Sequence, residues 1–260
     1  MKKVHYVNNY EINPHHPLTV NLIGCGGTGS QVLTSLGRMN YALVKLGHPG
    51  LHVLAYDDDI VTDANCGRQL FSEQEIGMNK AVALVTKLNW FFGTMWEAVP
   101  ETYGKGSDTA NITITCVDTV ASRQVVAERV KAKGSAYQHD MERPHYWMDF
   151  GNMADRGQVV LGTCGRTHLQ PKKEEAVGIL PDVTDVFDFD TLDTRDSGPS
   201  CSLAEALSKQ DLFVNSTLAQ MGCALLWKMF TKAVLDSHGL FLNLDTMRMT
   251  PMPIPMPEKK

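Results

Sequence analysis

The first half of the chain alternates short apolar runs with longer stretches that are apolar on one side only. A run that is apolar throughout is typical of a buried strand, whereas apolar positions three and four residues apart are typical of an amphipathic helix. We predict strands at 19–23, 51–56, 95–99 and 111–117, and helices at 30–39, 78–92 and 121–131. This order predicts a Rossmann-like α/β fold, in which a mostly parallel central sheet carries helices on both faces.

The pattern changes in the second half of the chain. Residues 146–150 and 158–162 predict two neighbouring strands, and the segment between them is too short for a parallel crossover. The two strands should therefore be antiparallel. A helical tract follows at 202–235, and a further strand candidate lies at 240–247. We expect the C-terminal half to add an antiparallel extension to the sheet.

Three segments lack a regular pattern. Residues 1–17 are polar and hold two prolines, which predicts an extended lead-in rather than a helix. Residues 163–200 form a long irregular stretch, which in a compact domain is typical of a functional or a disordered loop. Alternate prolines predict that the tail at 251–260 is extended or disordered. The length of 260 residues fits a single domain at 1–250 followed by this tail.

Composition and charge exclude two classes of protein. With 24 Lys and Arg against 29 Asp and Glu, the net charge is −5, which argues against direct binding of nucleic acid. The chain has no apolar run of about 18 residues that would span a membrane, and polar residues interrupt the place of a secretory signal. We expect a soluble, cytoplasmic protein, in which the six cysteines need not form disulfides.

The acidic excess is local. Six aspartates between residues 182 and 196 are opposed by Arg195 alone, and the rest of the chain has equal numbers of acidic and basic residues. The six are Asp182, Asp185, Asp188, Asp190, Asp193 and Asp196. One interpretation is a solvated loop. The other is a surface that attracts a partner with a basic face, at a rate that falls as salt increases.

A glycine-rich turn is the first candidate site. Gly24, Gly26 and Gly29 form a GxGxxG pattern directly between a predicted strand and a predicted helix. Glycines at such a place let phosphate oxygens approach the backbone and the N–H groups of the helix. Asp57 ends the next strand, where an acid can bind a ribose hydroxyl. These residues alone fit an NAD enzyme as well as an ATP enzyme.

Five sequence elements occur in a fixed order across the first half of the chain. They are Gly24-x-Gly26-Gly27-x-Gly29-Ser30, Asp57-x-Asp59, Asn65-x-x-Arg68-Gln69, Ile76-Gly77-x-x-Lys80-Ala81, and Val117-Asp118 with Arg123. This series resembles the adenylation domain of the ThiF/MoeB family, the bacterial relatives of ubiquitin-activating enzymes. Within the family, the stretches 202–206 and 210–215 look most similar to the ThiF-type proteins of PRTRC gene systems.

The resemblance implies an ATP-dependent adenylyltransferase. Such an enzyme joins the C-terminal carboxylate of a small ubiquitin-like or sulfur-carrier protein to the α-phosphorus of ATP and releases pyrophosphate. It further implies Mg²⁺ as a cofactor, a homodimer, and a crossover loop at about 163–201. The implied site residues are Gly24, Gly26, Gly27 and Gly29 in the phosphate turn, Asp57 and its neighbour Asp59 at the ribose, Asn65, Arg68, Gln69 and Lys80 around the phosphates, and Asp118 at Mg²⁺. Two anions must meet in this reaction, so the site must supply positive charge. The catalytic candidates are therefore Arg68 and Lys80, together with Asp118 as the residue that holds Mg²⁺.

Three of the charged residues also have a plainer interpretation. Lys80 near the start of an amphipathic helix can be a solvated charge. Asp118 can be the N-cap of the helix that begins near Ala121. Arg123 is better explained as the structural partner of a carboxylate than as a catalytic group.

Cys201 is a fourth catalytic candidate. Ser202-x-x-Glu205 is a capping box, so Cys201 lies just before a helix N-terminus, where the dipole favours a thiolate. Family members with a covalent step would form a thioester or persulfide at such a cysteine. Nearby aspartates would instead raise the pKa of the thiol, and a buried or incidental thiol is the alternative. No two cysteines are three positions apart, so we do not expect the structural zinc of many relatives.

Two other functions account for parts of the sequence. An NAD(P)-dependent oxidoreductase would explain the glycine turn and Asp57, but it leaves Arg68, Lys80 and Asp118 unexplained. A non-catalytic family member could bind a nucleotide and recruit other proteins without any chemistry. The presence of every charged element argues against this second possibility.

Overall fold

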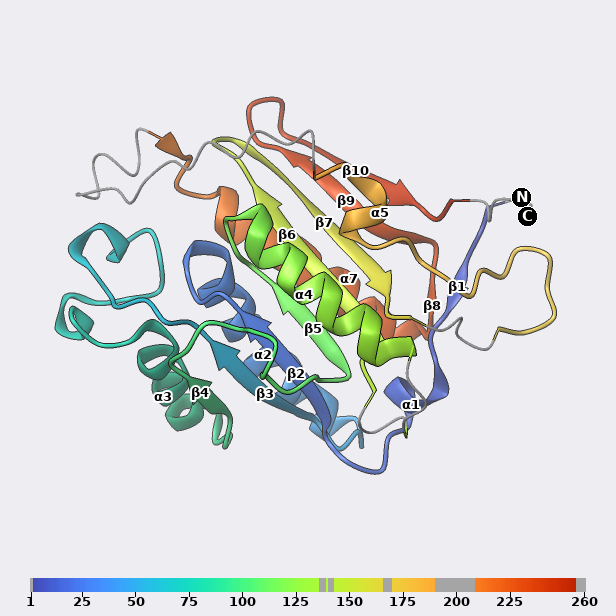
Figure 1. Cartoon of the computed structure of the whole chain (residues 1–260), viewed down its shortest axis with the longest axis horizontal. Coiled ribbons are helices and arrows are strands. Elements are labelled where there is room, and N and C mark those ends of the chain that lie inside the picture. The colour runs from blue at the N-terminus through green and yellow to red at the C-terminus, as the bar shows by residue number, and fades with distance from the viewer. Residues whose placement is uncertain (1, 136–138, 140–142, 166–169, 190–208, 256–260) are drawn as a thin grey trace.

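Figure 1 shows the fold in a computed structural model, which describes residues 2–135, 139, 143–165, 170–189 and 209–255. An eight-stranded sheet forms the centre, in the order β10-β9-β7-β6-β5-β2-β3-β4. Its strands are β2 (Leu18–Ile23), β3 (Leu51–Tyr56), β4 (Glu97–Val99), β5 (Ile112–Thr115), β6 (Tyr146–Asn152), β7 (Arg156–Thr163), β9 (Ser237–Asn243) and β10 (Arg248–Pro253). Strands β4, β3, β2, β5 and β6 are parallel, and β7, β9 and β10 extend the sheet in antiparallel fashion. The predicted fold class is confirmed.

Helices cover both faces of the sheet. Helices α2 (Gly27–Lys45), α3 (Lys80–Phe92) and α7 (Val214–Lys232) lie on one face, and α4 (Val120–Ser135) and the short α5 (Val183–Val186) lie on the other (Figure 1). Two separate clusters of buried side chains fill the space between the sheet and these helical layers. No helix among the described residues is long and apolar enough to cross a membrane.

The central elements follow from local sequence. All four residues of β5, Ile-Thr-Ile-Thr, are buried, as expected for a parallel strand that helices cover on both faces. Helix α3 begins after Asn79, whose side chain accepts a hydrogen bond from the Val82 N–H. It ends at Gly93, which adopts the left-handed conformation with φ +69°. Strong local signals of this kind explain why the predicted strands and helices of the first half are found.

The polar lead-in is not simply extended, so that prediction is wrong in part. Strand β1 (His5–Tyr6) pairs with β8 (Val234–Leu235), and α1 (Asn9–Ile12) forms one helical turn. Glu11 on α1 is buried, and its carboxylate forms a hydrogen bond with His145 Nδ1. These partners lie more than a hundred positions away in the sequence, which is why no local pattern indicates them.

The C-terminal strands differ in detail from the prediction. Strand β9 ends at Asn243, and a turn at 244–247 leads into β10. Pro251 and Pro253 belong to β10, which is tolerated because this strand lies at the edge of the sheet. Within the predicted helical tract at 202–235, α7 covers Val214–Lys232, whereas residues 210–213 are not helical and 234–235 belong to β8, so the prediction is wrong at these positions. Residues 202–208 of the tract lie outside the described residues.

Candidate functional site

Three loops meet at the carboxyl edge of the parallel sheet. They follow β2, β3 and β5 and begin at Gly24, Asp57 and Cys116. The Gly24 N–H donates a hydrogen bond to the Tyr56 carbonyl (2.9 Å), and the Cys116 N–H donates one to the Ile23 carbonyl (2.8 Å). These bonds join the three strand ends. Ligand sites of α/β sheets form at this edge.

The turn after β2 leaves the N-terminus of α2 open. Gly26 is the N-cap and has no side chain that could bond to the first N–H groups of the helix. Unpaired N–H groups and the helix dipole together favour an anion. A Cβ atom at Gly26 would meet no other atom within 4 Å, so there is free space in front of the turn. The geometry suits a phosphate group.

Two further glycines are required by the turn itself. Gly24 has φ +90°, and a Cβ there would lie 2.7 Å from the carbonyl oxygen of Cys116. A Cβ on Gly29 would lie 1.9 Å from the carbonyl oxygen of Gly24. Any other residue at either position would push the backbone apart. Gly24 and Gly29 are thus required for steric reasons, whereas Gly26 leaves open space in front of the turn.

Asp57 fastens the glycine turn to the next strand. Its Oδ2 accepts a hydrogen bond from the Cys25 N–H at 2.5 Å, and its Oδ1 accepts one from the Asp59 N–H at 2.9 Å. Burial raises the pKa of the Asp57 carboxyl, while the Cys25 amide and Lys80 lower it by smaller amounts. The predicted acid at the end of β3 therefore also shapes the turn, which sequence spacing does not indicate.

Lys80 lies at the start of α3 and faces the same edge. Its Nζ lies 2.7 Å from Asp59 Oδ2, and its side chain is only 10% exposed, against 68% for Asp59. The interpretation of Lys80 as a solvated charge is therefore wrong. A pair with an exposed carboxylate contributes little stability, so an anionic ligand can compete for this ammonium group.

A 3₁₀ turn at Asp63–Asn65 presents the Asn-x-x-Arg element. Asn65 Oδ1 accepts hydrogen bonds from the backbone and the side-chain hydroxyl of Thr62. The Asn65 carbonyl accepts a hydrogen bond from the Gln69 N–H. Asn65 thus shapes the turn that carries Arg68, in addition to any contact with a ligand.

Arg68 is a half-buried cation. Its Nη1 donates a hydrogen bond to Gln210 Oε1 at 3.1 Å, and its Nε is buried without a hydrogen-bond partner among the described residues. In the part of the chain that the structure describes, no carboxylate forms an ion pair with it. Burial lowers the pKa of the guanidinium. A buried charge without a counter-charge is costly, so this place favours an anionic ligand.

Asp118 is exposed in the loop that follows β5. The N-cap of α4 is the next residue, because the Thr119 hydroxyl oxygen accepts a hydrogen bond from the Ser122 N–H at 3.2 Å. The interpretation of Asp118 as the cap is therefore wrong. Its carboxylate is available at the edge of the sheet where the glycine turn lies.

Arg123 stabilises the loop that contains Asp118. Its Nη2 donates a hydrogen bond to the Val117 carbonyl at 2.7 Å, and its Nη1 donates one to the Thr119 carbonyl at 3.3 Å. Arg123 therefore binds the residues on both sides of Asp118. Its Nε forms a buried ion pair with Asp149 on β6, at 2.9 Å. The prediction that Arg123 is the structural partner of a carboxylate is confirmed.

The structure brings in four polar residues that sequence reasoning did not place at the site. Gln210 Oε1 accepts hydrogen bonds from Arg68 and from Asn215 Nδ2 (2.9 Å). Asn215 Oδ1 in turn accepts from Thr28 Oγ1 (2.9 Å) and from Asn152 Nδ2 (3.0 Å). The available signal was the stretch 210–215, which the resemblance singled out as a whole without assigning roles to its residues.

Part of the predicted site lies outside the described residues. This holds for Cys201, for its capping box, and for Asp190, Asp193 and Asp196 of the acidic run. Asp182, by contrast, is the N-cap of α5 and pairs with Lys131 at 2.9 Å, with its side chain only 4% exposed. Asp185 lies 3.5 Å from the same lysine. At least these two members of the run are thus already engaged by a cation within the fold.

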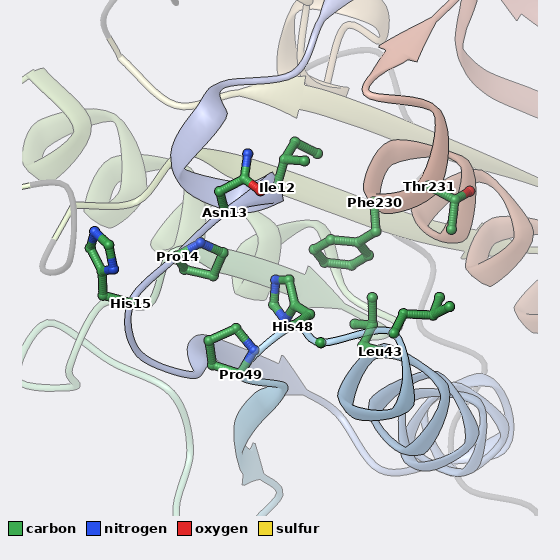
Figure 2. A pocket seen from close by; sticks show the side chains of 11 residues that line it. Ile12, Asn13, Pro14, His15, Leu43, His48, Pro49, Phe230 and Thr231 are labelled. Carbon is green, nitrogen blue, oxygen red and sulfur yellow. The ribbon is translucent and has the colours of Figure 1, made fainter.

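A cavity lies near the amino edge of the sheet, opposite to the candidate site (Figure 2). It has a volume of about 490 Å³ and is lined by residues from α1, the end of α2 and the end of α7. His48 lies there between Pro49 and Phe230; its Nδ1 accepts a hydrogen bond from the Gly50 N–H, so its Nε2 donates to the Glu11 carbonyl. Among the described residues that line this cavity there is no Lys, Arg, Asp or Glu, whereas Arg68 and Lys80 lie at the opposite edge of the sheet.

Comparisons with known proteins identify the family and the fold of the chain. The sequence matches the ThiF family over residues 16–260, and no curated protein matches it. Among solved structures, MccB of E. coli is similar with 17% identity and a TM-score of 0.60, over 94% of this chain and 63% of MccB. PaaA is similar with 14% identity and a TM-score of 0.56, over 91% of this chain and 64% of PaaA. The chain thus spans less than two thirds of either structure, and at these identities the likeness shows the fold.

Because the family match extends over nearly the whole chain, we conclude that this protein belongs to the ThiF family.

Proposed function

We propose that this protein is an ATP-dependent adenylyltransferase of the ThiF/MoeB type. Its substrate would be the C-terminal carboxylate of a small ubiquitin-like or sulfur-carrier protein, which is activated as an acyl-adenylate. The observation that carries the proposal is the half-buried Arg68, whose charge no described carboxylate neutralises, at the edge where α2 leaves its N-terminus open. MccB of E. coli, which shares the fold, has been solved with ATP and with AMPCPP and MccA.

The reaction needs positive charge at one place. A carboxylate oxygen attacks the α-phosphorus, the bond from that phosphorus to the bridging oxygen breaks, and pyrophosphate leaves. Two anions approach each other in this step, so cations and backbone N–H groups that are already in place lower its barrier. Arg68, Lys80 and the first turn of α2 provide them in this proposal, and Asp57 and Asp59 would lie near the ribose.

The residues also fit a magnesium ion. Mg²⁺ in phosphoryl-transfer sites is held by one or two carboxylates together with phosphates and water. Asp118 supplies an exposed carboxylate at the correct edge of the sheet, whereas no cluster of three or more metal-binding side chains occurs among the described residues. When bound with ATP, the ion would neutralise part of the triphosphate charge. The PRTRC branch, the homodimer and the role of Cys201 stay predictions.

The direct test is exchange between ATP and labelled pyrophosphate in the presence of candidate carrier proteins. We expect exchange that depends on both ATP and a carrier with a free C-terminal carboxylate. ATP binding without exchange, with every carrier supplied, would favour the non-catalytic alternative. Binding of a nicotinamide nucleotide without affinity for ATP would refute the proposal.

Lys80→Ala should lower the rate of this exchange by about 10²-fold, because one preorganised cation is lost from the site. The matched control is Lys45→Ala, since Lys45 is exposed at the other end of α2. The exchange rate of each variant is compared with that of the unmodified protein. Equal rates for both variants would remove Lys80 from the mechanism.

The two glycines of the turn should respond differently to alanine. Gly29→Ala should lower the free energy of unfolding by about 1–3 kcal/mol, because the new methyl group collides with the Gly24 carbonyl. Gly26→Ala should leave stability nearly unchanged, because the space there is open, yet it should weaken ATP binding by occupying that space. Thermal unfolding and calorimetric titration with ATP measure the two effects. Unchanged ATP affinity in Gly26→Ala would show that the phosphates do not approach this face.

A further inference from the structure

Arg68 has a neutral partner where a buried arginine commonly has an acid. A long guanidinium side chain must be held in one conformation if it is to meet a ligand, and fixing it costs rotamer entropy. Here the described contact of the guanidinium is with the amide oxygen of Gln210, which lies 142 positions later in the chain. An amide oxygen accepts the hydrogen bond without cancelling the positive charge. The contact therefore orients Arg68 and leaves its charge available.

Gln210 itself is held at both ends of its amide. Its Nε2 donates a hydrogen bond to the Met153 carbonyl at 3.2 Å, in the turn between β6 and β7. Its Oε1 accepts from Arg68 and from Asn215 Nδ2. Met153 offers an acceptor, whereas Arg68 and Asn215 offer donors. Only one orientation of the Gln210 amide therefore satisfies all three hydrogen bonds.

Asn215 connects this arrangement to the glycine turn. It lies at the start of α7 and is 3% exposed. Its Oδ1 accepts from Thr28 in the first turn of α2, and a Cβ on Gly27 would lie 2.5 Å from its Nδ2. A chain of hydrogen bonds thus runs from Arg68 through Gln210 and Asn215 to the N-terminus of α2.

We propose that Gln210 is a positioning residue, which holds Arg68 toward the phosphate site through a bond that preserves the charge of the guanidinium. Asn215 fixes Gln210 and sets its distance from the glycine turn. The inference deepens the proposed function and rests on it for its effect on catalysis. The contact itself can be measured without any catalytic activity.

The first measurement is the reactivity of Arg68 toward phenylglyoxal in the full-length protein, followed by peptide mass spectrometry. Gln210→Met removes the acceptor and keeps the length of the side chain, so Arg68 should react several times faster. Gln210→Glu replaces the amide by a carboxylate, so Arg68 should be held in an ion pair and react more slowly. Arg156, which is exposed and pairs with Asp155, serves as the internal reference.

The second measurement is a double-mutant cycle in the exchange assay. Gln210→Met should lower exchange by about tenfold to a hundredfold, as expected when a catalytic group is misplaced. In an Arg68→Ala background the same change should have little further effect, because its route through Arg68 is gone. A purely structural role would instead give additive losses and a parallel loss of thermal stability.

The outcomes separate the two claims. If the reactivity of Arg68 is the same in Gln210→Met as in the unmodified protein, the inference is wrong, whatever the activity. Additive losses in the cycle would overturn it as well. If the unmodified protein shows no exchange while Arg68 still responds to both Gln210 variants, the positioning contact is supported and the proposed function is rejected.

Discussion

Asp118→Asn should lower the rate of ATP–pyrophosphate exchange by about 10²–10³-fold and leave the free energy of unfolding within about 0.5 kcal/mol. The large first effect follows because an amide of the same size cannot hold Mg²⁺ against the triphosphate as a carboxylate does. The small second effect follows because Asp118 is exposed and does not cap α4. Exchange rates over a range of Mg²⁺ concentrations, together with urea unfolding, measure both.

The neighbouring residue provides a matched control. Thr119→Ala removes the hydroxyl that caps α4 and should cost about 1 kcal/mol of stability. It should leave exchange nearly unchanged, because Thr119 is not assigned to the nucleotide or the metal. Asp118→Asn should thus lower exchange without lowering stability, and Thr119→Ala should do the reverse. Full exchange activity in Asp118→Asn would contradict the assignment of Asp118 to the metal.

The second large effect concerns stability. Arg123→Met should lower the free energy of unfolding by about 3–5 kcal/mol, because Asp149 then stays buried without its counter-charge. The Thr115 hydroxyl still donates a hydrogen bond to Asp149, at 2.5 Å, but it brings no positive charge. The carbonyls of Val117, Thr119 and Phe150 each lose a hydrogen bond from the arginine side chain. Urea unfolding followed by circular dichroism measures the loss.

The loss should depend on pH in a definite direction. Burial raises the pKa of Asp149 above its ordinary value even with Arg123 present, and removal of Arg123 should raise it further. Between the ordinary pKa and the raised one, the folded state binds more protons than the unfolded state, so stability falls as pH rises. The deficit of Arg123→Met should therefore be larger at neutral pH than in mild acid. A deficit that is equal at both would show that Asp149 is not its cause.

A double variant identifies the source of the loss. Arg123→Met combined with Asp149→Leu removes both charges and replaces them with apolar groups of similar volume. It should be more stable than Arg123→Met alone, because no unpaired charge stays buried. If it is no more stable than Arg123→Met, the unpaired charge of Asp149 is not the source of the loss.

The site could be predicted in part because its signals are local. The strand, the glycine turn and the helix at 19–39 are contiguous, and the Asn-x-x-Arg and Lys80 elements each lie next to a turn or a helix start. The contact between Lys80 and Asp59 joins residues 21 positions apart, within one strand-to-helix unit. Because these residues are close in the sequence, motif and spacing alone are enough to indicate a candidate phosphate-binding site.

Other features depend on residues that are far apart in the sequence. Arg123 could be assigned to a carboxylate by residue type, but Asp149 became its partner only when β6 paired with β5. The one-turn helix α1 has a local cap in Asn8, but the partner of its buried Glu11 is His145, which lies 134 positions later in the chain. The partner of Arg68 is Gln210, because α7 packs beside α2 and brings the start of α7 to the glycine turn.

The sequence by itself therefore determined the fold class, and it predicted a candidate site after the parallel strands with residue types that suit phosphate binding. These features follow from the periods of strands and helices and from the backbone freedom of glycine. Only the tertiary structure decided which charges are neutralised. Lys80 has an exposed acid as its partner, Arg123 has a buried one, and Arg68 has a neutral amide. Neutralisation depends on distance and burial in the folded chain, and sequence position does not specify either.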